Sequence, residues 1–108
     1  MLYAQIDPIP VPWASTHGLF VVKRHQDTEV RSLEIVDDAG GCYQLWLGIP
    51  QEDGSVSVSV AQRADSTRKA RTETFTASIV NLRETLDRAY RAAEAWMHDE
   101  GHTRTPVL

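Results

Sequence analysis

The clearest pattern in the chain is the strict alternation of serine and valine in "GSVSVSVAQ", residues 54–62. Successive side chains of a β-strand point to opposite faces of a sheet, so the valines share one face and the serines share the other. The segment therefore predicts a strand that packs one face into an apolar core and presents small hydroxyl groups on its second face.

Further segments between residues 18 and 75 carry β-branched and aromatic residues and are separated by turn residues. They read "GLFVVKRH", "EVRSLEIVDD", "CYQLWLGIP" and "RKARTETF". Together with the serine–valine segment they predict an antiparallel meander of about five strands. Which side of the last segment faces the core is left open, because neither of its alternating sets is clearly apolar.

Turn residues set the register that we expect between neighbouring strands. A two-residue turn at residues 53–54, an Asp-Gly pair, places Leu47 opposite Val60. A three-residue turn at residues 39–41 places Leu33 opposite Leu47. The apolar side chains then share one inner face, which consists of Leu33, Ile35, Tyr43, Leu45, Leu47, Ile49, Val56, Val58 and Val60.

The hydrophobic period changes to 3.6 from about Thr76 to Glu100, which predicts a long amphipathic helix. Thr76 or Ser78 is the expected N-cap, with Phe75 and Val80 as a hydrophobic staple, and Gly101 is suited to end the helix. Its apolar stripe consists of Ile79, Leu82, Leu86, Ala89, Tyr90, Ala93, Trp96 and Met97. The expected fold is therefore α+β, with this C-terminal helix packed on the inner face of the sheet.

Both ends of the chain are expected to lie outside the main domain of residues 18–101. Three prolines in "DPIPVPW" predict a polyproline-like arm over residues 1–17, which a short strand at residues 2–6 could precede. The arm either lies over the edge of its own core or docks on a second protomer. Residues 102–108 are expected to be a frayed tail.

The face opposite the valines, called the outer face below, is expected to place Trp46 in a field of small residues. Small side chains let another backbone or ring approach closely, and Trp is enriched at interface hot spots. The predicted partner or dimer face consists of Trp46, Gly48, Ser57, Ser59, Ala61 and Gln44.

The width of the sheet gives a second reason to expect a partner. Five strands span about 20–24 Å, whereas one helix is only about 10–12 Å across. The outer face is then solvated, covered by the N-terminal arm or covered by another chain. A homodimer is the commonest solution of the last kind.

Length, net charge and cysteine count limit the classes of protein to which the chain can belong. The chain has 108 residues, enough for one domain, and a formal net charge of −4, which argues against general affinity for nucleic acid or anionic lipid. A single cysteine excludes an intrachain disulfide and favours a reducing, cytoplasmic location. No segment reads as a membrane helix or a signal peptide.

A local basic cluster supports an alternative function. Its members, Arg63, Arg68, Lys69 and Arg71, could contact phosphates of single-stranded nucleic acid, with Trp46 and Tyr43 stacking on bases. The same residues also suit a charged edge hairpin that discourages aggregation.

In topology alone, over residues 29–100, the order of strands and helix resembles the small single-strand DNA-binding transcriptional coactivators and the Whirly proteins. The resemblance implies a meander and helix that dimerise and bind DNA on the sheet. No motif matches residue by residue, and the acidic turns depart from the basic character of those families.

No catalytic or metal-binding motif stands out. "HDEGH" at residues 98–102 is interpreted as a solvated helix end, Cys42 as a strand-end residue, and Asp37 with Asp38 as a turn. We therefore expect no metal, cofactor or catalysis. The second alternative function is a small-ligand enzyme with a pocket between helix and sheet near Tyr43, Tyr90 and Trp96.

These observations favour a small non-catalytic binding or adaptor protein of the accessory type. It would self-associate, or bind a protein partner or a small apolar ligand, through the open sheet face. Nucleic-acid binding and catalysis are the two alternatives to this hypothesis.

Overall fold

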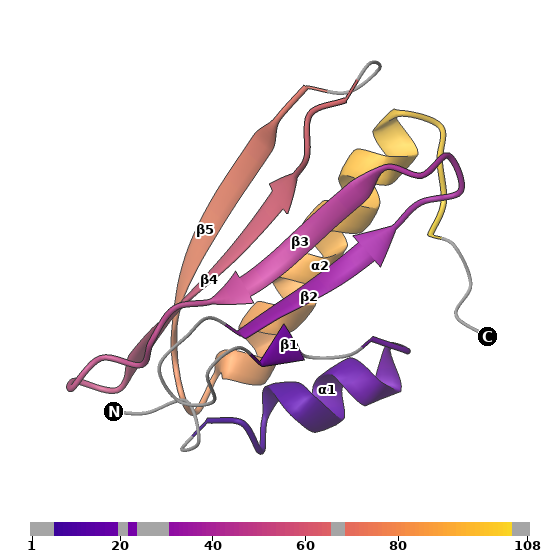
Figure 1. Ribbon diagram of the computed structural model, residues 1–108. Coiled ribbons are helices and arrows are strands. Elements are labelled where there is room, and N and C mark those ends of the chain that lie inside the picture. The colour runs from indigo at the N-terminus through magenta and orange to yellow at the C-terminus, as the bar shows by residue number, and fades with distance from the viewer. Residues whose placement is uncertain (1–5, 20–21, 24–30, 66–68, 105–108) are drawn as a thin grey trace.

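The computed structural model describes residues 6–19, 22–23, 31–65 and 69–104 (Figure 1). It has an α+β fold, in which an open antiparallel sheet is combined with a long C-terminal helix and one short helix. The elements are α1 (Pro10–Thr16), β1 (Val22–Lys23), β2 (Arg31–Val36), β3 (Cys42–Leu47), β4 (Ser55–Gln62), β5 (Arg71–Ser78) and α2 (Leu82–Asp99).

The sheet is a meander in which each strand pairs with its neighbours in sequence. In the described residues, β2 to β5 are full strands of six to eight residues, whereas β1 is a two-residue segment paired with β2. The expected number of about five strands was slightly too high. Gly18 and Leu19, the first two residues of the first expected strand, instead belong to the end of α1, because their N–H groups donate to carbonyls of that helix.

The turn between β2 and β3 lies one residue earlier than expected. Asp37 N donates to Gly41 O (3.0 Å), so residues 38–40 form the three-residue turn. The Asp37 carboxylate holds it there, because its Oδ1 accepts hydrogen bonds from Ala39 N (3.0 Å) and Gly41 N (2.7 Å).

The turn between β3 and β4 has three residues instead of the expected two. Gln51 N donates to Ser55 O (2.8 Å), which leaves residues 52–54 as the turn. Gly54 has a φ of +85°, the left-handed conformation that closes a three-residue turn. Gly48 N also donates to Ser57 O, so the segment from Gly48 to Gln51 contains one residue more than the opposite segment from Ser55 to Ser57.

Both hairpins are consequently displaced by two residues from the expected register. Leu47 pairs with Val58 instead of Val60, and the β2–β3 pairing is shifted equally. A shift of two residues leaves every side chain on its expected face, since the alternation has a period of two. The inner face is as predicted except at Ile49, which lies beyond β3 and is 45% exposed.

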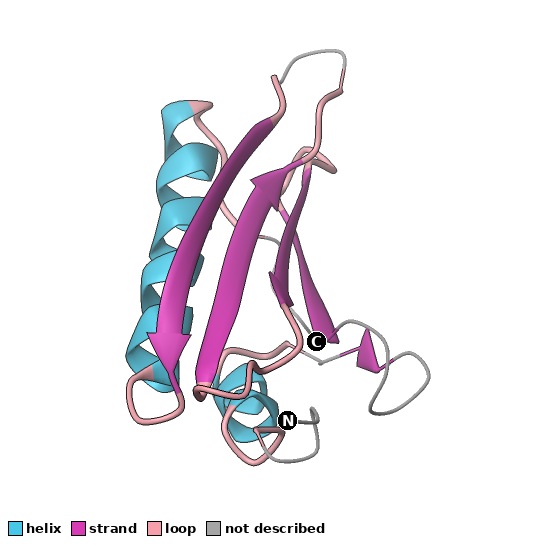
Figure 2. Ribbon diagram, turned by 90° about the vertical axis from the view of Figure 1, so that its left-hand side faces the viewer, coloured by secondary structure: helices cyan, strands magenta, loops and turns pink. Residues whose placement is uncertain are grey.

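α2 packs along the inner face and encloses one apolar core, as Figure 2 shows from the side. The facing of β5 is settled by its pairing, because Phe75 lies opposite Val58 and Glu73 lies opposite Val60. The buried core residues of the strands and α2 are Leu33, Ile35, Tyr43, Leu45, Leu47, Val56, Val58, Val60, Ala77, Leu82, Leu86, Ala89, Ala93 and Met97.

The long helix begins later than its apolar period predicts. β5 continues through Ser78, because its backbone pairs with β4 as far as Ser55. Thr76 and Ser78 are therefore strand residues and not N-caps, and Ser78 N donates to Asn81 Oδ1 (2.7 Å). Val80 is 96% exposed and forms no hydrophobic staple.

The proline-rich segment is a short helix, so the expectation of a polyproline arm was wrong. Pro10 is the first residue of α1 and Pro12 lies in its first turn, where backbone N–H groups have no intrahelical acceptor. Trp13 and Ala14 are buried and join the core of the same chain. Of the strand suggested at residues 2–6, only Ile6 is described, and it lies in a turn.

The residues after α2 are held against the sheet and not frayed. Thr103 O accepts a hydrogen bond from Asp38 N (2.8 Å). The Arg104 guanidinium donates to the carbonyls of His17 and Gly18, which anchors the chain to the end of α1. The rest of the expected tail, residues 105–108, lies outside the described residues.

No helix in the described part of the chain is long and apolar enough to cross a membrane.

Candidate functional site

The outer face of β4 and β5 is a double row of small hydroxyl side chains. Cross-strand pairing places Ser55 opposite Ser78, Ser57 opposite Thr76, Ser59 opposite Thr74 and Ala61 opposite Thr72. Ser59 and Thr74 share a hydrogen bond of 3.0 Å between their hydroxyl oxygens. The threonine row was not predicted, because the sequence left the facing of β5 open.

Trp46 is the large side chain of this outer face, and the structure places it on the predicted face with different neighbours. It lies opposite Ser32 on one side and Ser59 on the other, whereas the expected register, two residues away, would place Glu34 and Ala61 there. Both serines are nearly buried, at 5% and 6% exposure, whereas the indole is half-buried. Trp46 therefore still offers apolar surface to a partner.

Beside Trp46 the outer face is hollowed by a cavity of about 220 Å³, called the Trp46 hollow below. Its lining consists of Glu34, Cys42, Tyr43, Gln44, Trp46, Ala61 and Arg63. Glu34 and Arg63 carry opposite charges, and neither forms an ion pair with any described residue. The hollow thus combines an aromatic wall, an amide and two available charges.

The absence of a side chain at Gly48 is explained by a contact within the same chain. A Cβ atom built at this position would lie 2.4 Å from Ser57 Oγ, so the serine side chain occupies the space above the glycine. The close approach expected of an external chain at Gly48 is made here by a neighbouring strand.

The basic cluster predicted from the sequence is divided between the two faces. Arg63 lines the Trp46 hollow, whereas Arg71 lies on the helix side and forms ion pairs with Asp99 (3.5 Å) and Glu100 (3.8 Å). Lys69 is exposed, and Arg68 lies outside the described residues. The described members therefore do not form one strip.

The three aromatic residues expected around a helix–sheet pocket have separate roles. Tyr43 is fully buried and donates its hydroxyl to Asp37 Oδ2 (3.0 Å). Tyr90 accepts a hydrogen bond from Arg104 Nη1 (3.1 Å), and Trp96 is half-buried against the core. Neither Tyr90 nor Trp96 lines the Trp46 hollow or the cleft at α1.

An aromatic cluster that the sequence gave no reason to expect joins α1 to α2. Trp13 stacks on His17 with ring centroids 4.2 Å apart, and the edge of Tyr90 meets both rings. Trp13 Nε1 donates to Asp87 Oδ1 (2.8 Å). The contacts of Trp13 with Asp87 and with Tyr90 join residues more than seventy positions apart, which is why periodicity alone cannot find them.

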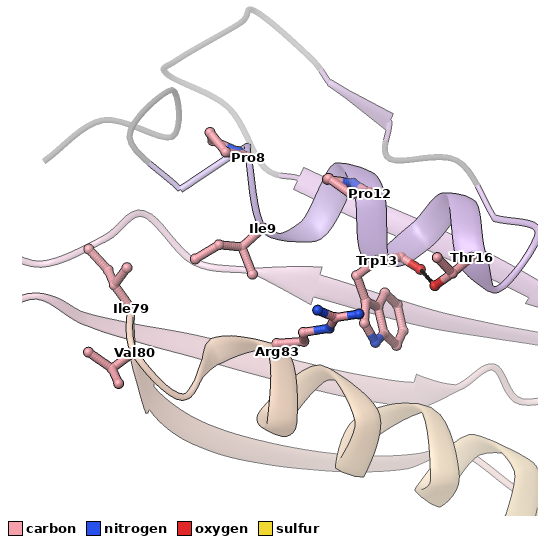
Figure 3. A pocket seen from close by; sticks show the side chains of 8 residues that line it. All are labelled: Pro8, Ile9, Pro12, Trp13, Thr16, Ile79, Val80 and Arg83. Atoms are coloured by element: carbon pink, nitrogen blue, oxygen red, sulfur yellow. Dashed lines mark hydrogen bonds between the residues drawn. The ribbon is translucent and has the colours of Figure 1, made fainter.

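Next to this cluster lies a second cavity, of about 250 Å³, called the α1–α2 cleft below (Figure 3). Its lining from α1 and the preceding turn consists of Pro8, Ile9, Pro12, Trp13 and Thr16. On the other side it is lined by Ile79 and Val80, in the turn before α2, and by Arg83 in the first turn of α2. The cleft was not predicted from the sequence, because the proline-rich segment was expected to be an extended arm.

His102, Asp38 and Cys42, which were considered from the sequence for metal binding or catalysis, contact other groups of the chain. His102 Nδ1 lies 3.0 Å from an Asp38 carboxylate oxygen, and the Cys42 thiol is 3.9 Å from Gly40 O. Hydrogen bonds from Ser55 lower the pKa of the exposed Asp53 carboxyl from its usual value. In the described residues, no three His, Cys, Asp or Glu side chains gather in a way that suits a metal ion.

Comparison with models of protein families, with curated protein sequences and with solved structures finds no match to this chain.

Proposed function

We propose that the protein is a non-catalytic binding protein that self-associates through its outer face. The observation that carries the proposal is the combination of Trp46 and the two available charges on a sheet face that no described helix covers. In Figure 2 the long helix lies on the opposite side of the sheet.

The charges on the outer face suit a second copy of the same chain. In a two-fold dimer one surface must be complementary to itself, so it needs both members of each interacting pair. Glu34 and Arg63 provide such a pair within one hollow. An antiparallel arrangement of two outer faces brings Glu34 of one protomer to Arg63 of its partner.

The small side chains on the outer face of β4 and β5 lower the entropic cost of forming this interface. Serine and threonine lose little rotamer entropy on burial, in contrast to lysine or glutamate. Their hydroxyl groups can donate and accept hydrogen bonds, so each can find a partner across a flat interface. Trp46 supplies a rigid aromatic anchor of the kind that dominates interface energies.

The size of the sheet sets the expected affinity. Four strands of about six to eight residues cover roughly 20 by 25 Å, or about 500 Å² in projection. A standard stable interface buries about 800 Å² on each partner. We therefore expect a reversible dimer that dissociates on dilution in the micromolar range.

The test is molar mass measured by sedimentation equilibrium across a range of concentrations. The wild-type chain should pass from monomer to dimer, and Trp46→Glu should remain monomeric because a carboxylate would be buried in the interface. Val80→Glu is the matched control, since Val80 is exposed and lies away from the outer face. A wild-type chain that is monomeric at all concentrations contradicts the proposal.

A charge exchange tests the arrangement of the two protomers. Glu34→Arg or Arg63→Glu alone should weaken the dimer by placing like charges opposite each other, and the double variant should restore it. Equal weakening in all three variants would reject the antiparallel arrangement.

The other hypotheses receive less support. The separation of Arg63 from Arg71 gives no reason to favour nucleic-acid binding. Among the described residues, no group of ionisable side chains converges on both Tyr90 and Trp96 in a way that favours catalysis. The cytoplasmic location stays a prediction.

A further inference from the structure

We propose that the α1–α2 cleft binds a small organic carboxylate with an apolar body, and that Arg83 is the partner of the carboxylate group. This site is independent of the outer face, because the two share no lining residue.

The walls of the cleft are apolar and one of them is fixed in place. Trp13 is only 2% exposed, and its indole is held by the hydrogen bond from Nε1 to Asp87. Ile9 and Ile79 are half-buried, Ile9 on the segment that enters α1 and Ile79 on the turn before α2 (Figure 3). Since these walls exist without a ligand, binding requires little reorganisation.

Val80 adds apolar surface that the fold itself does not bury. Its side chain is 96% exposed at the rim of the cleft, in the turn between β5 and α2. A ligand that covers Val80 removes apolar surface from water, which favours binding.

Arg83 is the charged group of the cleft and is available for a ligand. Its side chain extends from α2 toward Trp13 in Figure 3, and it forms no ion pair with the described residues. Asp87, one helical turn away, accepts the hydrogen bond from Trp13 instead. Because Arg83 lies in the first turn of α2, the helix dipole disfavours its charge, and an anionic ligand would offset this effect.

The other polar side chain of the cleft is already engaged. The Thr16 hydroxyl donates to Trp13 O (2.7 Å), so it has no proton left for a ligand. A single guanidinium suits one carboxylate, with two parallel hydrogen bonds, better than a phosphate ester with several anionic oxygens to satisfy.

The volume of the cleft limits the size of the ligand. A cavity of about 250 Å³ is smaller than most drug-sized sites and corresponds to about eight molecules of liquid water. The expected ligand is therefore a monocarboxylic acid whose body is comparable to one apolar side chain.

Titrations followed by two-dimensional ¹H–¹⁵N NMR of the full chain test the proposal. The probes are phenylacetate, the neutral phenylacetamide, and acetate, which lacks the apolar body. Phenylacetate should shift the Trp13 indole signal and bind roughly tenfold more tightly than phenylacetamide, because only the acid forms a charge-assisted pair. Acetate should give no saturable shift.

Variants identify the carboxylate partner. Arg83→Gln should weaken phenylacetate binding to the level of phenylacetamide while leaving phenylacetamide binding unchanged. Arg88→Gln is the matched control, since Arg88 is exposed on the same helix and does not line the cleft. Val80→Ser should weaken both aromatic probes equally.

Three results would overturn the proposal. They are equal affinity for acid and amide, an unchanged affinity in Arg83→Gln, and shifts that centre on Trp46 instead of Trp13. The titrations are run on the Trp46→Glu variant as well, so that failure of self-association does not affect the outcome.

Discussion

The two faces of the sheet are made by the same strands, but they are stabilised in different ways. On the inner face, side chains such as Leu45 and Val58 are fully buried under α2. On the outer face, hydroxyl groups and one half-buried indole meet no helix in the described residues. The inner face therefore supplies most of the hydrophobic stabilisation of the fold, whereas the described helices leave the outer face uncovered.

The largest expected effect comes from removing apolar volume on the inner face. Leu45→Ala should lower the free energy of unfolding by about 2–5 kcal/mol, through lost burial and the cavity left behind. Ser57→Ala, on the outer face, should change it by less than about 0.5 kcal/mol. Chemical denaturation followed by circular dichroism measures both, and similar losses for the two variants would break the contrast between the faces.

An intermediate effect is expected from the hydrogen bonds of each face. Tyr43→Phe removes the donor to the buried Asp37 carboxylate and should lower the free energy of unfolding by about 1–3 kcal/mol. Ser59→Ala removes the hydroxyl pair with Thr74 and should cost less than about 1 kcal/mol, because the exposed Thr74 can bond to water instead.

The same denaturation experiment compares these two variants. A loss in Ser59→Ala as large as that in Tyr43→Phe would show that the outer face contributes to the fold as strongly as the inner face does.

The smallest effect concerns Asp53, in the turn between β3 and β4. Asp53 is exposed, and hydrogen bonds from Ser55 lower its pKa from the usual value of 3.8. Because the folded pKa lies below the unfolded one, the stabilisation is present at neutral pH and is lost as pH falls through the folded pKa. The small stability difference between wild type and Asp53→Asn should therefore shrink on acidification.

Urea titrations of wild type and Asp53→Asn at neutral pH and below the usual pKa measure this difference. A difference that grows on acidification would contradict the assignment of the hydrogen bonds from Ser55 as its cause.

Much of the fold could be predicted from local pattern. The alternation of residues 54–62 determined which side chains share a face, and the faces survived a register error of two residues because their period is two. The 3.6-residue stripe predicted the buried side of α2, including Leu86 and Ala89. Trp46 was placed on the correct face for the same reason.

The rest depended on contacts between distant segments, which only the tertiary structure could decide. The sequence alone could not show that Asp37 would hold the first turn, that β4 would extend β5 through Ser78, or that Trp13 would meet Asp87. The α1–α2 cleft likewise joins two segments that no local period connects. Local pattern determines the face of a strand or helix because it reflects backbone geometry, whereas registers, caps and cavities follow from which segments pack together.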